Sequence, residues 1–223
     1  MTDPRPVIAI IGGTGDLGSG LARRWSAAGY TVLIGSRTRD KAETAARDIA
    51  ANSGDVRGLD NIAAAREGDI VVLSVPFSSH DVTLQEIKAE LINKILVDAV
   101  VPLVPPKVAT AQPPPEGSAA RIAANLLGEQ TRVVSAFHNV GASKLHSGQP
   151  IDCDVLVFGD SKAARDQVIV LIGDIGLSGV DGGVLANSSA AETLTSVLIG
   201  INRRYKIEGP GIRITGLPAS QDG

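Results

Sequence analysis

The sequence predicts an α/β fold with a doubly wound, mostly parallel sheet and a smaller C-terminal α/β lobe. Short runs of β-branched and other apolar residues alternate with helical patterns, as they do where βαβ units feed a parallel sheet. The runs are almost continuously apolar, which is typical of strands covered by helices on both faces. With 223 residues, the chain is long enough for one full domain and a modest second lobe.

Six segments fit such strands. We expect a first domain over residues 1–136, which contains five of them, and a C-terminal lobe over residues 137–223, which contains the sixth. The predicted strands are residues 7–11, 31–35, 69–75, 94–99, 132–136 and 153–158.

Helical patterns fill the intervals between these strands. Between the first two strands, apolar side chains recur with helical spacing at Leu17, Leu21, Trp25 and Ala28. One face of this helix should therefore pack inward, with Arg23 and Arg24 pointing outward. Further helices are expected over residues 39–51, 119–127, 161–173 and 188–206, with Ser118 as the N-cap of the second of these. On the last helix, Leu194, Leu198, Ile201 and Tyr205 form a stripe that fits either the core or a dimer face.

Residues 102–117 hold six prolines and cannot form regular structure, because each proline lacks an N–H and restricts the residue before it. A loop of this length in a compact domain is often functional.

The composition favours small molecules as partners. A formal net charge of −3 without a basic run argues against nucleic acid or an anionic membrane. The single cysteine, Cys153, allows no internal disulfide, and without clustered His/Cys spacing we expect no metal site. The apolar runs are too short for a signal peptide or a membrane span. We therefore expect a cytoplasmic protein.

A glycine-rich turn follows the first predicted strand and opens the first helix. It reads Gly13-Thr14-Gly15-Asp16-Leu17-Gly18. The first glycine of such a motif allows a tight turn, the second lets the backbone approach a pyrophosphate, and the third lets helix and strand pack closely. In this strand, turn and helix context the motif predicts a dinucleotide site of the Rossmann type.

The end of the second strand indicates which dinucleotide is bound. An acidic residue is common there and accepts from a free ribose 2′-hydroxyl, but this chain has Ser36 and Arg37, with Lys41 one helical turn further on. Hydroxyl and cationic donors suit the 2′-phosphate of NADP, which a carboxylate would repel. The alternative is a solvated arginine at the start of a surface helix.

Two further segments end at the carboxyl edge of the predicted sheet, where ligands bind in open α/β folds. Pro76 and Phe77 leave the strand at 69–75, and Phe77 could flank a nicotinamide or belong to the core. His138 follows the strand at 132–136 and is a candidate site residue, although a lone histidine is more often structural. His80 and His146 are weaker candidates.

Several segments in order along nearly the whole chain resemble the NADPH-dependent reductases of coenzyme F-420, an 8-hydroxy-5-deazaflavin. They read IIGGTGDLGSGLA, VLIGSRTRDKAE, VVLSVPF, VVPLVP, EGSAA, SAFHNVGA and NRRYKIEGPGIRI. The resemblance implies reversible hydride transfer between nicotinamide C4 of NADP(H) and C5 of the deazaflavin. It also implies a Rossmann domain with a small C-terminal lobe, in a homodimer.

The resemblance also assigns roles to residues. Asp16 stands where the family often has an uncharged residue. Thr14 to Leu17 would hold the pyrophosphate, and Ser36, Arg37 and Lys41 the 2′-phosphate. Phe77, Leu103 and Ala142 match positions that touch the cofactor. His138 and Val140 match the pair beside the deazaflavin ring, with His138 in a positioning or polarising role. The cofactor-binding set is Gly13, Thr14, Gly15, Asp16, Leu17, Ser36, Arg37, Lys41, Pro76, Phe77, Leu103, Val140 and Ala142.

Two other functions remain open from the residues themselves. The same fold could serve an NADP-dependent reductase of another acceptor, such as a ketone, an imine or a flavin. It could also serve a non-enzymatic protein that senses NADP(H).

Overall fold

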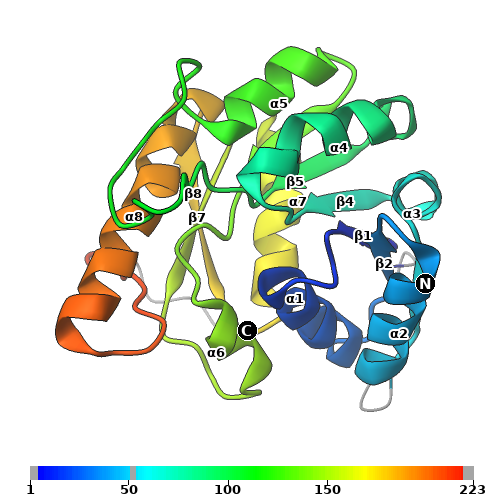
Figure 1. The fold of residues 1–223 in the computed structure, drawn as a ribbon, viewed down its shortest axis with the longest axis horizontal. Coiled ribbons are helices and arrows are strands. Elements are labelled where there is room, and N and C mark those ends of the chain that lie inside the picture. The colour runs from blue at the N-terminus through cyan, green and yellow to red at the C-terminus, as the bar shows by residue number, and fades with distance from the viewer. Residues whose placement is uncertain (1–4, 51–53, 218–223) are drawn as a thin grey trace.

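The computed structural model describes residues 5–50 and 54–217. One sheet runs through it, with the strand order β3-β2-β1-β4-β5-β6-β7-β8 (Figure 1). All neighbouring strands are parallel, except that β6 and β7 are antiparallel. The strands are β1 (Ile8–Ile11), β2 (Val32–Ser36), β3 (Val56–Asp60), β4 (Ile70–Leu73), β5 (Ile95–Asp98), β6 (Arg132–Ser135), β7 (Asp154–Gly159) and β8 (Ser178–Gly183).

Helices cover both faces of this sheet (Figure 1). One apolar cluster packs α1 (Asp16–Ala27), α2 (Arg39–Ala50) and α7 (Lys162–Gly173) against the strands. The other packs α3 (Asn61–Glu67), α4 (His80–Ile87) and α5 (Ala119–Leu127) on the opposite face. Helix α6 (Ala142–His146) lies against α1, and α8 (Ser188–Tyr205) contacts α5 and β7. The predicted Rossmann-type, doubly wound fold is therefore confirmed.

All six predicted strands are present, each with ends within two residues of the expected ones. The helices expected near 119–127, 161–173 and 188–206 are also present, and the Ser118 hydroxyl caps α5 by accepting from the Arg121 N–H at 3.1 Å. Helix α2 ends at Ala50, and residue 51 of its predicted range lies outside the described residues. Residues 102–117 contain neither helix nor strand, as their prolines require.

Strands β3 and β8 were not predicted from the sequence. They read VRGLD and SGVDGG and lie at the two edges of the sheet. An edge strand is covered less completely than a central one, so charged residues and glycines replace the apolar run that identifies a buried strand.

The C-terminal part of the chain extends the same sheet. Ser135 in β6 pairs with Phe158 in β7, and α7 covers the face that α1 also covers. Trp25 of α1 donates from its ring N–H to the Leu171 carbonyl of α7 at 2.9 Å. The division of the chain at residue 136 stays a prediction.

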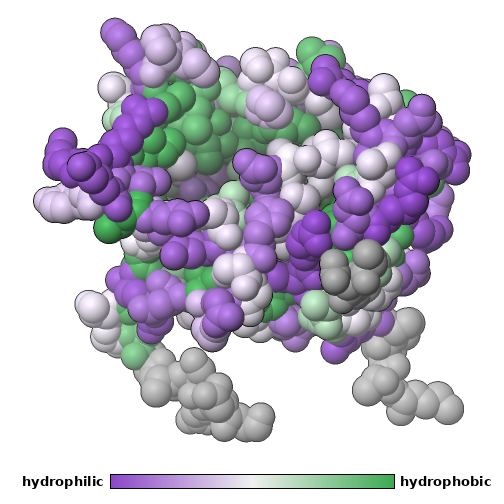
Figure 2. Space-filling view, turned by 60° about the horizontal axis from the view of Figure 1, so that its bottom comes forward, coloured by the Kyte–Doolittle hydropathy of each residue, from purple (hydrophilic) through white to green (hydrophobic). Residues whose placement is uncertain are grey.

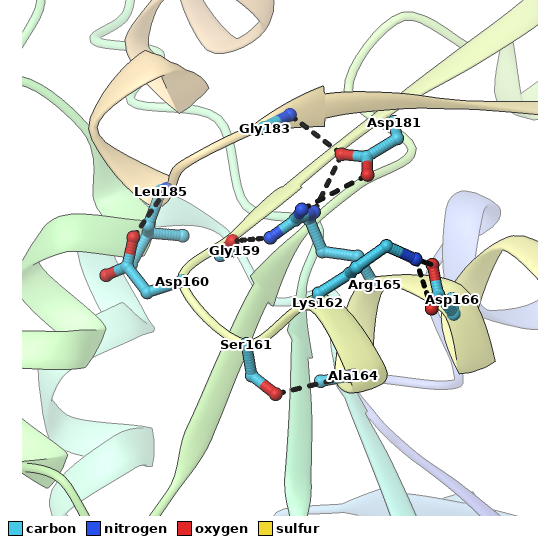
Figure 3. Close-up of polar contacts among 10 residues, drawn as sticks. All are labelled: Gly159, Asp160, Ser161, Lys162, Ala164, Arg165, Asp166, Asp181, Gly183 and Leu185. Carbon is cyan, nitrogen blue, oxygen red and sulfur yellow. Dashed lines mark hydrogen bonds and ion pairs between the residues drawn. The ribbon is translucent and has the colours of Figure 1, made fainter.

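A polar network fixes the turn between β7 and α7 to β8 and to the segment before α8 (Figure 3). The Arg165 guanidinium donates to both carboxylate oxygens of Asp181, at 2.7 and 3.1 Å, and to the Gly159 carbonyl. The Asp160 carboxylate accepts from the Leu185 N–H at 3.0 Å. These contacts set the direction in which α8 returns toward the carboxyl ends of β5 and β6.

Strand order reverses between β1 and β4, because the chain builds outward through β2 and β3 and then returns to the other side of β1. Such a switch point leaves a crevice at the carboxyl ends of the two central strands, where ligands bind in open α/β sheets.

Candidate active site

The glycine-rich turn lies at this switch point. Gly12 adopts a φ of +83°, and a Cβ there would stand 2.9 Å from the Ser74 carbonyl oxygen. A Cβ on Gly18 would stand 2.8 Å from the Gly12 carbonyl oxygen. Side chains are therefore excluded at both positions, which keeps the start of α1 close to β1 and β4. Gly15 is the N-cap of α1 and supplies no side-chain cap, so the first N–H groups of the helix are available to an anion.

A first cavity of about 450 Å³ opens beside this turn. It reaches from the glycine-rich turn across the end of β2 to the segment after β4. Six of the predicted cofactor-binding residues line it, namely Thr14, Gly15, Ser36, Arg37, Lys41 and Pro76. The sequence did not indicate Thr38, Asn61, Ser79 or Thr83, which also line it. Its lining residues are Gly12, Thr14, Gly15, Ser36, Arg37, Thr38, Lys41, Asn61, Ser74, Val75, Pro76, Ser79 and Thr83.

One end of the first cavity carries uncompensated donors. Arg37 and Lys41 are exposed, and neither side chain forms an ion pair with a described residue. Ser36 ends β2 and pairs with Asp60 of β3, but the Asp60 carboxylate is used as the N-cap of α3, where it accepts from the Ala63 N–H at 2.8 Å. Two cations and hydroxyl groups without an acidic partner suit a phosphate monoester.

A second cavity of about 390 Å³ continues from the first, since Ser74, Val75 and Pro76 line both. Its other walls are mainly apolar and come from α1, the turn after β4 and the proline-rich segment after β5. Apolar surface gathers in a hollow in the space-filling view (Figure 2). The remaining residues that line the second cavity are Leu17, Phe77, Ser78, Ala99, Val100, Val101, Leu103, Pro105 and Val108.

His138 lies in the connection between β6 and α6, and its side chain lines neither cavity. His138 is only 4% exposed. Neither ring nitrogen has a hydrogen-bond partner of normal geometry among the described residues, although a contact with the Asp98 backbone opposes the lowering of the His138 pKa. Burial lowers the pKa of His138 to about 4, against the opposing charge of Asp98. The imidazole is therefore neutral near pH 7 and has one donor and one acceptor unused.

Val140 and Ala142 follow His138 and also lie outside the two cavities. Val140 is buried, and Ala142 begins α6. Their segment lies close to the C-terminal tail, because a Cβ on Gly141 would stand 2.6 Å from the Gly209 Cα.

Two side chains hold α6 against α1. Arg24 donates to the carbonyl oxygens of Leu145 at 3.0 Å, Lys144 at 3.1 Å and Gln149 at 2.7 Å, where a cation satisfies the free carbonyls of a helix C-terminus. The prediction that Arg24 points outward is therefore wrong. His146 donates from Nε2 to the Asp16 carbonyl at 2.8 Å. These contacts connect the segment that follows His138 to the glycine-rich turn.

A cluster of buried ionisable groups lies at the carboxyl ends of β5 and β6. His80 Nε2 and Asp98 Oδ2 are 2.8 Å apart, and both side chains are fully buried. Burial alone would lower the pKa of His80, but hydrogen bonds and charges from Asp98 and Asp81 outweigh it and raise the pKa to about 9. His80 therefore stays protonated near neutral pH. From the sequence, His80 was only a weaker candidate and Asp98 was not a candidate.

Glu192 of α8 completes this cluster. Its carboxyl oxygens accept from the Ala119 and Ala120 N–H groups at 2.6 and 3.2 Å, at the start of α5. Burial raises the pKa of Glu192 to about 8, helped by the charge of Asp98 and opposed by the two N–H groups and by His80. For Asp98 the signal was a carboxylate at the end of an otherwise apolar strand, whereas Glu192 shares the buried face of α8 with Ser188 and Ser196 and gave no such signal.

A Rossmann-type fold, an uncapped helix at a glycine-rich turn and donors without acidic partners define a dinucleotide-binding protein. Residues 7–102 match the family described as NADP oxidoreductase, coenzyme F420-dependent. The F420-dependent NADP reductase of Methanocaldococcus jannaschii is 44% identical over 221 residues, covering 94% of this chain and 98% of that protein. The chain belongs to this family.

A second relative and a solved structure are also similar to this chain. The F420-dependent NADP reductase of Methanothermobacter thermautotrophicus is 41% identical over 224 residues, covering 96% of this chain and 97% of that protein. Among solved structures, a candidate F420-dependent NADP reductase from Arthrobacter sp. FB24 has a TM-score of 0.77 at 24% identity, covering 94% of this chain and 99% of that one. That structural likeness establishes the fold alone.

Proposed function

We propose that this protein catalyses reversible hydride transfer between NADP(H) and coenzyme F-420. The observation that carries the proposal is the continuity of the two cavities through Ser74, Val75 and Pro76. One cavity presents phosphate-binding donors and the other an apolar slot, in a chain similar over its length to F420-dependent NADP reductases. When both are bound, the two cofactors supply the redox chemistry, in which a hydride passes between nicotinamide C4 and deazaflavin C5.

The first cavity is proposed to hold the adenosine and pyrophosphate parts of NADP(H). Thr14, Asp16 and Leu17 offer backbone N–H groups at the start of α1, since those of Gly13 and Gly15 donate to the Ile10 and Gly12 carbonyls. Ser36, Arg37 and Lys41 bind the 2′-phosphate. Asp16 is the first residue of α1 and is exposed, so its carboxylate can turn to solvent rather than face the phosphates. Thr38, which lines the same cavity, adds a fourth donor.

The second cavity is proposed to hold the nicotinamide ring and the ring of its hydride partner. Pro76, Phe77 and Leu103 form its apolar walls and exclude water. The protein's task there is to hold two rings at reacting distance, so few catalytic side chains are needed.

His138 and Val140 are proposed to complete the deazaflavin side, and Ala142 to contact the dinucleotide. Both imidazole nitrogens of His138 lack a partner among the described residues, which supports assigning a ligand atom to one of them. Because the imidazole is neutral, its N–H can donate to a ring oxygen or nitrogen without adding charge. We assign it a positioning or polarising role.

Mixing the protein with NADPH and oxidised coenzyme F-420, while following the visible absorbance of the deazaflavin, tests the proposal. Catalytic bleaching is the expected result. Turnover of NADPH with a ketone, an imine or a flavin, but not with the deazaflavin, would replace it with another reductase activity. Tight NADPH binding without transfer to any acceptor would instead indicate a sensor of NADP(H).

We further propose a cytoplasmic homodimer in which the C-terminal lobe, residues 137–223, completes the deazaflavin site and supplies the interface. On α8, Leu198 is buried, but Val197 is 51% and Tyr205 67% exposed. Apolar side chains exposed on one helix support a contact with a second copy. Light scattering should give twice the chain mass, and a Val197→Asp/Tyr205→Asp variant should give the monomer mass. No helix among the described residues is long and apolar enough to cross a membrane.

A further inference from the structure

The buried pair of His80 and Asp98 has no role in the hydride transfer described above. His80 Nε2 lies 2.8 Å from Asp98 Oδ2, and neither side chain is exposed. The other ring nitrogen of His80 lies 2.9 Å from Asp81 Oδ1, whose side chain is largely exposed. Burying two charges removes both from water, and such a pair is weak evidence for stability as such. The position of the His80 and Asp98 pair in the fold indicates another role for it.

The pair connects two walls of the second cavity. His80 directly follows the Phe77–Ser79 turn, and its backbone N–H donates to the Phe77 carbonyl. The centroids of the His80 and Phe77 rings are 6.1 Å apart. Asp98 ends β5, and its second oxygen accepts from the Val100 N–H at 3.0 Å. Phe77 stands on one wall of the cavity and Val100 on the other. The contact between the His80 and Asp98 side chains therefore sets the distance between the segment that contains Phe77 and the segment that contains Val100.

We propose that His80 and Asp98 are positioning residues, which fix the width of the second cavity and so orient the nicotinamide ring for hydride transfer. This inference rests on the proposed function, because it places the nicotinamide half of NADP(H) in that cavity. The phosphate donors Ser36, Arg37 and Lys41 come from the end of β2, the segment after it and the first turn of α2, so they do not depend on the contact between the two walls.

Two double variants isolate the contact between the walls. Removing one partner alone would leave a buried charge unpaired and could unfold the protein. His80→Gln/Asp98→Asn is neutral and can still bridge the walls, because the amide N–H introduced at position 98 can donate to the amide oxygen introduced at position 80. His80→Leu/Asp98→Asn is also neutral and of similar volume but has no bridging hydrogen bond. Tyr30→Phe, which breaks the part-buried Tyr30 to Asp174 contact elsewhere in the fold, serves as a destabilised control.

Each protein is titrated with NADPH and with 2′,5′-ADP, which lacks the nicotinamide half, and is then assayed for deazaflavin reduction. We expect the bridged variant to stay within about threefold of the wild type in all measurements. The unbridged variant should keep its affinity for 2′,5′-ADP, lose NADPH affinity relative to it, and lose about 10- to 100-fold in kcat, as small misplacements of reacting groups do. Tyr30→Phe should lower the melting temperature only.

The proposal is overturned if the two double variants behave alike, or if the unbridged variant loses 2′,5′-ADP affinity as strongly as NADPH affinity. The test separates this outcome from failure of the proposed function. If the wild-type protein does not reduce the deazaflavin, the proposed function fails, but the ratio of the NADPH and 2′,5′-ADP dissociation constants still reports on the cavity width.

Discussion

Gly18 of α1 lies against the backbone of Gly12, so that a Cβ on Gly18 would stand 2.8 Å from the Gly12 carbonyl oxygen and 2.6 Å from the Ser74 hydroxyl oxygen. The third glycine of the motif therefore fixes the distance between the start of α1 and the ends of β1 and β4. The N–H groups proposed to bind the pyrophosphate owe their position to this contact.

Gly18→Ala should displace the start of α1 and weaken NADPH binding by about tenfold or more, because aligned backbone donors are lost. Gly173→Ala in α7 is the matched control, since nothing lies within 4 Å of its added Cβ. That change should raise stability by about 0.4–1 kcal/mol and leave binding unchanged. Calorimetric titration with NADPH measures the difference, and equal affinities for the two variants would contradict the role given to Gly18.

Arg37→Ala should weaken NADPH binding by about 10- to 100-fold, because a hydrogen bond to a charged group contributes about 1.5–3 kcal/mol. NADH binding should change little, since NADH has no 2′-phosphate. Arg47→Ala, a change of an exposed arginine on the helix that follows, controls for charge. Dissociation constants for both cofactors check this, and an equal loss for NADPH and NADH would remove Arg37 from the 2′-phosphate site.

The central part of the fold could be predicted because its strands are buried on both faces and read as apolar runs. At β1, for example, every residue from Ile8 to Ile11 is fully buried. The edge strands β3 and β8 could not be found this way, because half-covered strands tolerate residues such as Arg57 and Asp181. Their place in the sheet follows from contacts distant in the sequence, as with Arg165 and Asp181 in Figure 3.

The two ends of the site also differ in how far the sequence alone could predict them. The phosphate end depends on a local motif and on residues one helical turn apart, such as Arg37 and Lys41, so the sequence alone indicated it. The pair of His80 and Asp98 joins residues 18 positions apart, and Glu192 meets Ala119 across 73 positions. Only the packed structure brings such groups together.

His138→Ala should slow hydride transfer or raise the KM for coenzyme F-420, while NADPH affinity stays nearly unchanged. The pKa of His138 is lowered to about 4 by burial, so its protonation should produce no inflection in the wild-type rate between about pH 6 and pH 9. Steady-state kinetics over this range, with NADPH titrations of both proteins, measure both effects. A large loss of NADPH affinity in the variant would place His138 in the dinucleotide site instead.

Glu192→Gln should make the protein more stable than the wild type at alkaline pH. The folded-state pKa of Glu192 is raised to about 8, first by burial, above its ordinary value in the unfolded chain. The folded state thus retains a proton that the unfolded state releases above about pH 4.5, so this group's contribution falls as the pH rises toward 8. Glutamine keeps an oxygen for the Ala119 N–H but does not titrate.

Chemical unfolding at several pH values tests this prediction. The variant and the wild type should have similar free energies of unfolding near pH 5, and the variant should gain an advantage that grows up to about pH 8 and stays constant above it. The wild type should also lose stability as the pH rises from about 6.5 to about 9, because the folded-state pKa of His80 is raised to about 9 and its contribution is complete only below about 6.5. That second loss should persist in Glu192→Gln, since the variant leaves the His80 and Asp98 contact intact. A difference between the two proteins that is independent of pH would mean that Glu192 is ionised in the folded state, and that its carboxylate serves as an ordinary cap of α5.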